Sequence, residues 1–231
     1  MAKRPVFIPI GKPGHLVEEV LVDFEWNPGF ALIQKKKNVA ALHESADKEG
    51  LSPLLEVSTK SDERLGQRLS AFSLKVETDI GKISLEAAYQ GSKVFEKGGP
   101  YTDIYRKDSK RAKQDPRIQE SGSLTGFDYF GRTWPLAPET AFYDWLYLSA
   151  LSLHQEFLKR LYSYKGFTDI EFNPQRSINC QAHTCALLVS LLKLNSLDKA
   201  LRSQHDFIDM ISSDSFKKDH SAELRQQKLA M

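Results

Sequence analysis

Cysteine is scarce in this sequence, because Cys180 and Cys185 are the only two among 231 residues. Both lie in a stretch with helical spacing, and no group of cysteine and histidine residues has the spacing of a zinc site. The chain also lacks any apolar run near the roughly 20 residues that span a bilayer. These absences predict a reduced, cytoplasmic protein that has no membrane segment and requires neither a metal ion nor another cofactor.

A strong excess of one charge sign is absent as well. The 32 basic and 30 acidic residues leave a formal net charge of +2, so total charge does not indicate a polyanionic partner, although a local basic patch can still form. The content of 41% hydrophobic and 27% charged residues is typical of a soluble globular protein. We expect one domain over residues 1–212 and a charged tail over 213–231 that forms a loose helix or is disordered.

The spacing of apolar residues predicts a helix-rich α+β domain with a small β component. Period-two alternation indicates strands, and apolar residues three or four apart indicate helices. The polar segment 98–122, bounded by glycines, predicts a loop with short helices. The expected helices cover 31–50, 84–95, 141–167 and 180–195, with another between the strands of segment 54–83, and the expected strands or hairpins cover 20–26, 54–58, 74–78 and 126–140.

The stretch SLEAAYQGSKVF, residues 84–95, combines helical spacing with a row of polar side chains. Ser84 is a suitable N-cap, which places Glu86 in the first turn, where the helix dipole and free N–H groups favour an ionised carboxylate. Glu86, Gln90 and Lys93 recur at i, i+4 and i+7 and therefore share one face. Such a row can grip a sugar or a phosphate, but the solvated face of an ordinary amphipathic helix has the same spacing.

Two basic segments are candidates for binding phosphate or nucleic acid. The run QKKKN contains Lys35 and Lys37, and residues 101–117 combine six basic residues with Tyr101 and Tyr105. Charges that follow a backbone and rings that stack on bases suit a nucleic-acid strand. Both segments are also explained as charged, solvated surface, and interspersed aspartates dilute the charge of the second.

Polar residues also interrupt two apolar regions. Asp144 precedes Trp145 inside an apolar helical segment, where an acid needs a partner or a role. Further on, Asp169, Asn173 and Arg176 surround an Asn-Pro turn before a helix, an arrangement that can bind an anion. The alternatives are an outward-facing aspartate in the first case and helix capping in the second.

Residues 84–95 resemble the central signature of NADAR proteins, S-x-E-x-x-[FY]-Q-x-x-K-x-F. Further segments are similar to the antitoxin branch that accompanies DarT-type toxins, namely FEWNPGFALIQKKKNVAALH, LLEVSTKSDERLGQRLSAF, GGPYTDIY, TAFYDWLYL and FTDIEFNPQRSINCQA. The resemblance runs from about Val20 to about Ala200. The residues that match the signature are Ser84, Glu86, Tyr89, Gln90, Lys93 and Phe95, whereas Ala87 stands where the family often has histidine.

The resemblance implies a NADAR-like fold and hydrolysis of an N-glycosidic bond. For the antitoxin branch it implies removal of ADP-ribose from modified guanine bases in single-stranded DNA, with a DarT-type toxin as the genetic partner and free ADP-ribose as the product. Other members hydrolyse small metabolites such as riboflavin-pathway intermediates. That activity is the alternative here, together with a non-catalytic module that binds ADP-ribose or nucleic acid.

The resemblance also assigns the site, with Glu86 at the position of the family's key acid. The bond to the anomeric carbon breaks through a transition state in which positive charge grows on the sugar, so a fixed carboxylate is expected to stabilise that charge and activate water. A lysine or a protonated acid is expected to help the base leave, with Lys35 or Lys37 as the choice. The expected catalytic residues are Glu86, Lys35, Lys37 and Asp144, and the expected substrate-binding residues are Tyr89, Gln90, Lys93, Tyr101, Trp145, Asp169, Asn173 and Arg176, with no metal ligand.

Overall fold

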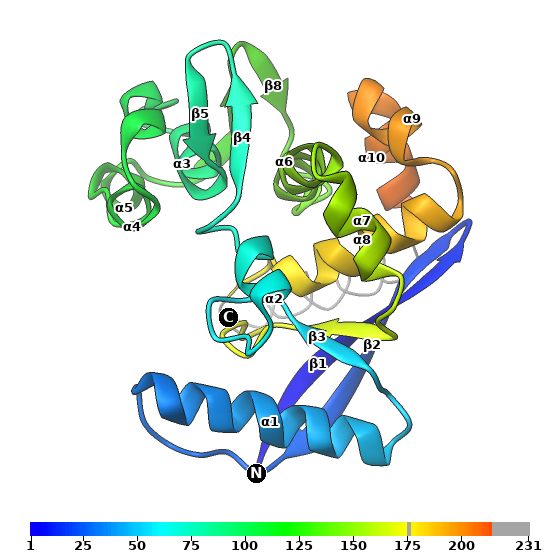
Figure 1. Ribbon diagram of the computed structural model, residues 1–231. Coiled ribbons are helices and arrows are strands. Elements are labelled where there is room, and N and C mark those ends of the chain that lie inside the picture. The colour runs from blue at the N-terminus through cyan, green and yellow to red at the C-terminus, as the bar shows by residue number, and fades with distance from the viewer. Residues whose placement is uncertain (175–176, 214–231) are drawn as a thin grey trace, which may run out of the picture.

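The computed structural model describes residues 1–174 and 177–213 (Figure 1). The predicted tail over 213–231 therefore lies outside the described residues, apart from Ser213, and Arg176 lies outside them as well. The prediction of a single domain over 1–212 stays a prediction. The α+β class is confirmed, because helices and several small sheets alternate along the chain.

The largest sheet has four strands in the order β2-β1-β9-β3. Strands β1 (Ala2–Lys12) and β2 (His15–Phe24) form a long antiparallel hairpin. Strand β9 (Gly166–Thr168) pairs antiparallel with β1 and parallel with β3 (Leu54–Glu56). Because β3 and β9 are parallel and in register, their carboxyl ends lie side by side, with Glu56 opposite Thr168.

The sequence predicted a strand over 20–26, but β2 is longer than this and β1 was not predicted at all. The N-terminal prolines obscured the signal, because proline cannot donate a ladder hydrogen bond and is unusual within a sheet. Pro5 and Pro9 nevertheless lie in β1, opposite Leu21 and Val17 of β2. The ladder between β1 and β9 has a single paired position, at Phe7, so β1 needs few N–H donors on that side.

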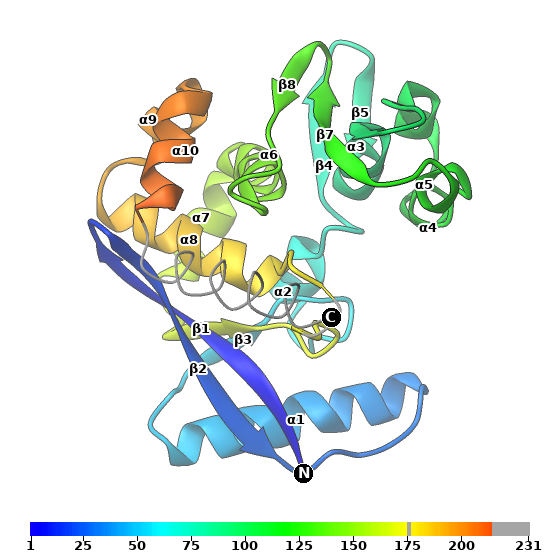
Figure 2. The same cartoon turned by 180° about the vertical axis from the view of Figure 1, so that it is seen from behind.

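Two helices cover the two faces of this sheet, and Figure 2 shows them from behind. Helix α1 (Leu32–Lys48) buries Val39 and Leu42 in a cluster with Val6 of β1. The next residue of β1, Phe7, points to the opposite face and packs in the main core with α8 (Gln181–Lys193). The alternation of side chains along β1 thus builds one apolar layer on each side of the sheet.

The predicted helix over 180–195 is confirmed as α8, whereas the predicted helical region over 141–167 is helical only up to Leu161, and Gly166 and Phe167 lie in β9. Helix α6 (Ala141–Ser152) is buried almost all round, as is usual for a helix inside a core. Around α6 and α8 lie three shorter helices, α7 (Gln155–Leu161), α9 (Leu197–Arg202) and α10 (Gln204–Ser212). None of the helices within the described ranges is both long and apolar enough to cross a membrane.

The middle of the chain forms the upper part of the molecule in Figure 1. The predicted strand, helix and strand of segment 54–83 are confirmed as β3, α2 and β4, and the loop with short helices is confirmed as well. A hairpin of β4 and β5 stands beside a three-stranded sheet of order β6-β7-β8. The elements are α2 (Arg64–Leu69), β4 (Lys75–Thr78), β5 (Gly81–Ser84), α3 (Leu85–Gly91), β6 (Lys93–Phe95), η1 (Thr102–Arg106), α4 (Ser109–Lys113), α5 (Arg117–Glu120), β7 (Leu124–Tyr129) and β8 (Arg132–Trp134).

We expect Phe167→Ala to lower the free energy of unfolding by about 3–5 kcal/mol, because it empties a fully buried position in β9. Chemical denaturation with urea measures this change. The matched control is Phe30→Ala, since the Phe30 side chain is 98% exposed and its removal should leave stability within about 0.5 kcal/mol of wild type. Equal losses in the two variants would contradict the assigned core.

Candidate active site

Glu86 lies at the start of α3, and its side chain is only 6% exposed. Ser84 is the N-cap, as predicted, because its Oγ accepts a hydrogen bond of 3.1 Å from the N–H of Ala87. Glu86 Oε1 accepts a 2.9 Å hydrogen bond from Nε2 of Gln90, one turn further along the helix. Its second oxygen, Oε2, has no hydrogen bond to another residue of the described ranges. One carboxylate oxygen is thus fixed, and the other is available for a ligand or water.

The helix is shorter than predicted, since α3 ends at Gly91 and Lys93 begins β6. A Cβ atom on Gly91 would lie 2.6 Å from ring atoms of Tyr105, so η1 packs directly on the helix backbone at that point. The expected row of three polar residues on one helix is therefore wrong for Lys93. A solvated helix face is also wrong, because Glu86 and Gln90 are both buried.

Lys93 nevertheless lies beside the same group of side chains. Its Nζ is 4.9 Å from the ring centroid of Tyr89. Burial lowers the pKa of Lys93, and the negative charge of Glu86 opposes that shift. The turn after α3 therefore places the ammonium group of Lys93 within electrostatic reach of Glu86, as a longer helix would also have done.

Tyr89 and Tyr143 join α3 to the helical core. The hydroxyl of Tyr89 accepts a 2.7 Å hydrogen bond from Nδ2 of Asn179, in the loop before α8, and its ring meets that of Tyr143 edge to face at 5.3 Å. Burial raises the pKa of Tyr143 well above its ordinary value, and the charges of Glu86, Asp169 and Asp144 add to the shift. All three carboxyl groups are therefore within electrostatic reach of one phenol in α6.

Asp169 lies directly after β9 and is nearly buried. Its Oδ2 accepts a 3.0 Å hydrogen bond from Nε2 of Gln181, and its Oδ1 accepts one of 3.0 Å from the N–H of Glu171. The other end of Gln181 accepts a hydrogen bond from the N–H of Ala71, which fixes the amide between two loops. Burial raises the pKa of Asp169 above the ordinary carboxyl range, although these hydrogen bonds oppose the shift.

Glu56 ends the neighbouring parallel strand and is a second buried acid at this edge of the sheet. Its carboxyl group accepts hydrogen bonds from the N–H of Ile170 at 3.0 Å, from Oγ1 of Thr168 at 2.8 Å and from Oγ of Ser58 at 2.6 Å. Burial is the main cause that raises the pKa of Glu56, and the charge of Asp169 raises it further. Two acids that favour their neutral forms thus meet where β3 and β9 end.

The predicted lysines lie on α1 and have different surroundings. Lys35 is mostly buried, with Nζ 3.7 Å from Oε1 of Glu171 and 5.9 Å from the ring centroid of Trp26. Lys60 approaches the other oxygen of Glu171 at 3.4 Å. Lys37 is exposed. In the part of the chain that the structure describes, neither Lys35 nor Lys37 forms an ion pair with Glu86, so Lys35 belongs to the side of the site near Asp169.

Asp144 and Trp145 occupy the core rather than an open site. Asp144 is 1% exposed and accepts hydrogen bonds of 2.7 Å from both Thr140 and Thr184, so it ties α6 to α8. The Trp145 ring packs at 5.0 Å from that of Trp134, with the guanidinium of Arg132 at 5.5 Å. These contacts give both residues structural partners. A direct role for either in catalysis or in binding substrate stays a prediction.

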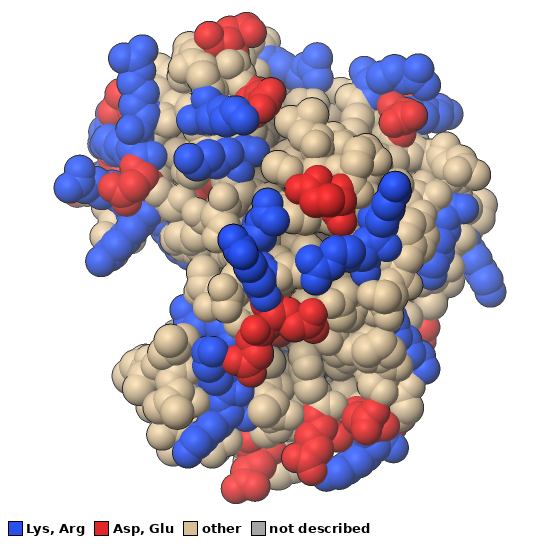
Figure 3. Space-filling view, in the orientation of Figure 1, with Lys and Arg blue, Asp and Glu red and all other residues tan. Residues whose placement is uncertain are grey.

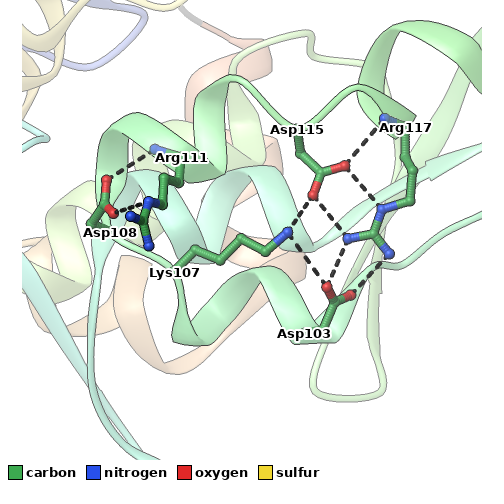
Figure 4. A network of polar contacts seen from close by, with 6 residues as sticks. All are labelled: Asp103, Lys107, Asp108, Arg111, Asp115 and Arg117. Carbon is green, nitrogen blue, oxygen red and sulfur yellow. Dashed lines mark hydrogen bonds and ion pairs between the residues drawn. The ribbon is translucent and has the colours of Figure 1, made fainter.

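Three of the six basic residues of segment 101–117 pair with its own aspartates, as Figure 4 shows. Arg117 donates to Asp103 and Asp115, and Lys107 lies 2.6 Å from Oδ2 of Asp115. Arg111 pairs with Asp108 at 3.4 Å. The network pins η1, α4 and α5 to one another, and much of the segment's charge is therefore internally compensated.

The remaining predicted binding residues lie at two further places. Tyr101 shares a hydrogen bond with Ser121, and the guanidinium of Arg117 lies 4.4 Å above its ring, so Tyr101 packs against one residue of the network in Figure 4. Asn173 follows β9, and its carbonyl oxygen accepts a 2.9 Å hydrogen bond from the N–H of Ser177. Arg176 lies outside the described residues. The roles of these three residues stay predictions.

Sequence reasoning missed Glu56 and Gln181. The signal for Glu56 was present, because it is a lone acid inside the apolar run LLEV and an acid there needs a partner. Gln181 had no such signal, since a glutamine at a helix start is unremarkable in a sequence. Its role arises only because the loop after β9 passes in front of α8.

We expect the free energy of unfolding to fall as pH rises above the ordinary carboxyl range, in part because of Glu56. Its pKa is raised in the folded state, so the folded protein binds a proton there that the unfolded chain has already lost. Glu56→Gln cannot titrate and should show a shallower fall between about pH 5 and about pH 8. Urea denaturation across this range measures the slope, with the exposed Glu120→Gln as the control that should keep the wild-type slope.

A comparison with known protein families identifies the family of the chain. A family model described as DarT1-associated NADAR antitoxin matches residues 2–221. No curated protein matches the chain at a significant level. Because the family match spans nearly the whole sequence, the suspected resemblance is confirmed. The chain belongs to the family of DarT1-associated NADAR antitoxins.

Proposed function

We propose that this protein removes ADP-ribose from modified guanine bases in single-stranded DNA and so acts as the antitoxin to a DarT-type toxin. Membership in the family supports an antitoxin role and an N-glycosidase type of activity in general. The observation that carries the finer proposal is Glu86, a nearly buried acid held at a helix start with one carboxylate oxygen free of any hydrogen bond to another described residue. The free thiols Cys180 and Cys185 fit a reducing, cytoplasmic location.

Glu86 performs two tasks in the proposed reaction. As the bond between the anomeric carbon and the guanine nitrogen lengthens, positive charge develops on the ribose, and the carboxylate stabilises it in a site with little water. The free oxygen Oε2 accepts a proton from the attacking water, whose oxygen forms the new bond to the anomeric carbon. Gln90 fixes the geometry through Oε1, so the acid loses little freedom when substrate binds.

Asp169 is the proton donor to the leaving base in this proposal. The guanine amine leaves poorly unless its nitrogen gains a proton as the bond breaks. Burial raises the pKa of Asp169, so this carboxyl group holds a proton closer to neutral pH than an exposed aspartate does. The predicted lysines fit the task less well, because Lys35 faces Glu171 and Lys37 is exposed. The donated proton is replaced from solvent after product release.

Lys93 and Gln90 are the proposed contacts for the ADP-ribose part. The ammonium of Lys93 offers a charge for the pyrophosphate, and the buried Oε1 of Gln90 has no hydrogen-bond partner within the described ranges and is available to a ribose hydroxyl. Arg176 stays a predicted contact for the pyrophosphate. All three aromatic residues predicted to stack on a base have packing partners in the structure, and of them Tyr89 lies next to Lys93.

One observation favours a second candidate function, the hydrolysis of a small nucleotide-like metabolite. The ion pairs of Figure 4 compensate much of the charge of the segment that was expected to hold a DNA strand. A small substrate does not need that segment, and the centre at Glu86 serves both substrates. A non-catalytic binding module is the third possibility, and it predicts tight binding of ADP-ribose without release of product.

We expect Glu86→Gln to lower kcat on guanine-ADP-ribosylated single-stranded DNA by at least about a hundredfold, because the amide neither stabilises the charge nor accepts a proton. Release of free ADP-ribose, followed by chromatography, measures turnover. Glu120→Gln changes an exposed acid in the same manner and should keep wild-type rates. Wild-type turnover in Glu86→Gln would remove this residue from the mechanism, and intact substrate with the wild-type protein would reject the proposed function.

Asp169→Asn should slow the reaction on the guanine conjugate by about a hundredfold and remove the fall in rate on the alkaline side of the pH profile. The sign follows from the active form, which is protonated and is lost as pH rises through the raised pKa. The nitrophenyl glycoside of ADP-ribose provides the control substrate, because its leaving group, nitrophenolate, departs without a proton. Asp169→Asn should hydrolyse this compound nearly as fast as wild type, whereas Glu86→Gln should fail on both; equal losses for Asp169→Asn would contradict the assignment.

A further inference from the structure

The loop between β2 and α1 exposes apolar side chains to an unusual degree. Phe30 is 98% exposed, and Leu32 and Ile33, in the first turn of α1, are 55% and 63% exposed. Gly29, with φ +123°, makes the turn that directs the chain outward just before Phe30. Isolated exposed apolar residues are common on protein surfaces, but three within four positions, at the end of a loop and in the first turn of the next helix, indicate a contact with another molecule. We call residues 28–37 the arm.

The charge next to these apolar residues is positive. Figure 3 shows uncharged side chains at the lower left, over the N-terminal end of α1, bordered by basic ones. Lys36 forms an ion pair of 2.7 Å with Asp62, and Lys35 faces Glu171, so nearby acids are already paired. Lys37 is exposed and has no ion pair within residues 1–174 and 177–213. The arm therefore presents an aromatic ring, two aliphatic side chains and an uncompensated cation.

The arm also begins at the edge of the candidate site. Lys35, two residues after Ile33, reaches Glu171 with its ammonium group at 3.7 Å. The N–H of Glu171 in turn donates to Asp169. A polymer whose modified unit lies at Asp169 and Glu86 has its neighbouring units close to the arm.

We infer that the arm is a docking element for a single-stranded nucleic acid, in which Phe30 stacks on an unpaired base next to the modified one and Lys37 contacts a phosphate. This inference rests on the proposed function and deepens it, because it commits the site to a polymeric substrate. Aromatic rings that stack on successive bases and cations that follow the backbone are the means by which proteins bind single strands. A stable protein partner needs about 800 Å² on each side, of which three side chains on a loop supply only part.

The main experiment compares two substrates that differ only in the strand. One is a single-stranded oligonucleotide with one ADP-ribosylated guanine near its centre, and the other is ADP-ribosylated deoxyguanosine monophosphate. Phe30→Ala should lower kcat/KM on the oligonucleotide about fivefold or more and leave kcat/KM on the mononucleotide unchanged. Leu153→Ala removes another exposed apolar side chain, 58% exposed, at the junction of α6 and α7 and should affect neither substrate.

Lys37→Gln tests the phosphate contact separately. The affinity for the oligonucleotide should depend less steeply on salt concentration, by about 0.7 in the logarithmic slope for a single strand. Lys48→Gln removes a charge from the other end of α1 and should keep the wild-type slope. An unchanged slope in Lys37→Gln would overturn the assigned phosphate contact.

A direct probe does not depend on catalysis. Phe30→Trp places a fluorescent ring on the arm, and addition of an unmodified single-stranded oligonucleotide should quench its emission, whereas Leu153→Trp should not be quenched. Quenching in Phe30→Trp supports docking even if the wild-type protein cleaves neither conjugate, so failure of the proposed function and failure of this inference are distinguishable. Equal effects of Phe30→Ala on both substrates, no effect on either, or loss only of binding to a toxin protein would each overturn the inference.

Discussion

The removal of carboxyl groups from water is the constraint on which the rest of this structure depends. Glu86, Glu56 and Asp169 are all buried, and a buried carboxyl group must either be held by hydrogen bonds or retain its proton. Glu86 lies at the start of α3, and its carboxylate accepts a hydrogen bond from the side-chain amide of Gln90. Glu56 and Asp169 have three and two hydrogen bonds respectively, and burial still raises the pKa of each. The elements of the fold are arranged so that these demands are met within reach of one another.

Two remote parts of the chain have to meet for this arrangement to form. The parallel pairing of β3 with β9 joins residues more than a hundred positions apart and brings Glu56 to Thr168 and Asp169. Helix α6 packs against both α3 and α8, and its Tyr143 is influenced by the charges of both Glu86 and Asp169. In the proposed reaction the two acids differ in role because their surroundings differ. Glu86 lies at a helix start that favours negative charge, whereas Asp169 lies in a buried loop that favours the neutral acid.

Some basic residues form ion pairs within the structure, and others remain available for recognition. The segment with the strongest basic pattern in the sequence uses much of its charge internally, where Asp103 and Asp115 bind Arg117 and Lys107. In the described residues Arg106, Lys110 and Lys113 of that segment stay exposed without an ion pair, as Lys37 does on α1. A count of charges along the chain could not distinguish the two segments, because pairing depends on which acids the fold brings within about 4 Å of each base.

Local sequence determined the longer helices, some of the strands and the identity of the central acid. The period of apolar residues predicted α1, α6 and α8, and the Ser84 cap placed Glu86 in a first turn, because these features depend on residues only a few positions apart. Tertiary structure decided what depends on distant contacts. The packing of Tyr105 on Gly91 coincides with the end of α3 before Lys93, the meeting of β3 and β9 made Glu56 part of the site, and the core enclosed Asp144. Burial and pairing between remote segments leave no periodic pattern in a sequence. Only the folded structure therefore shows which acidic side chains are removed from water.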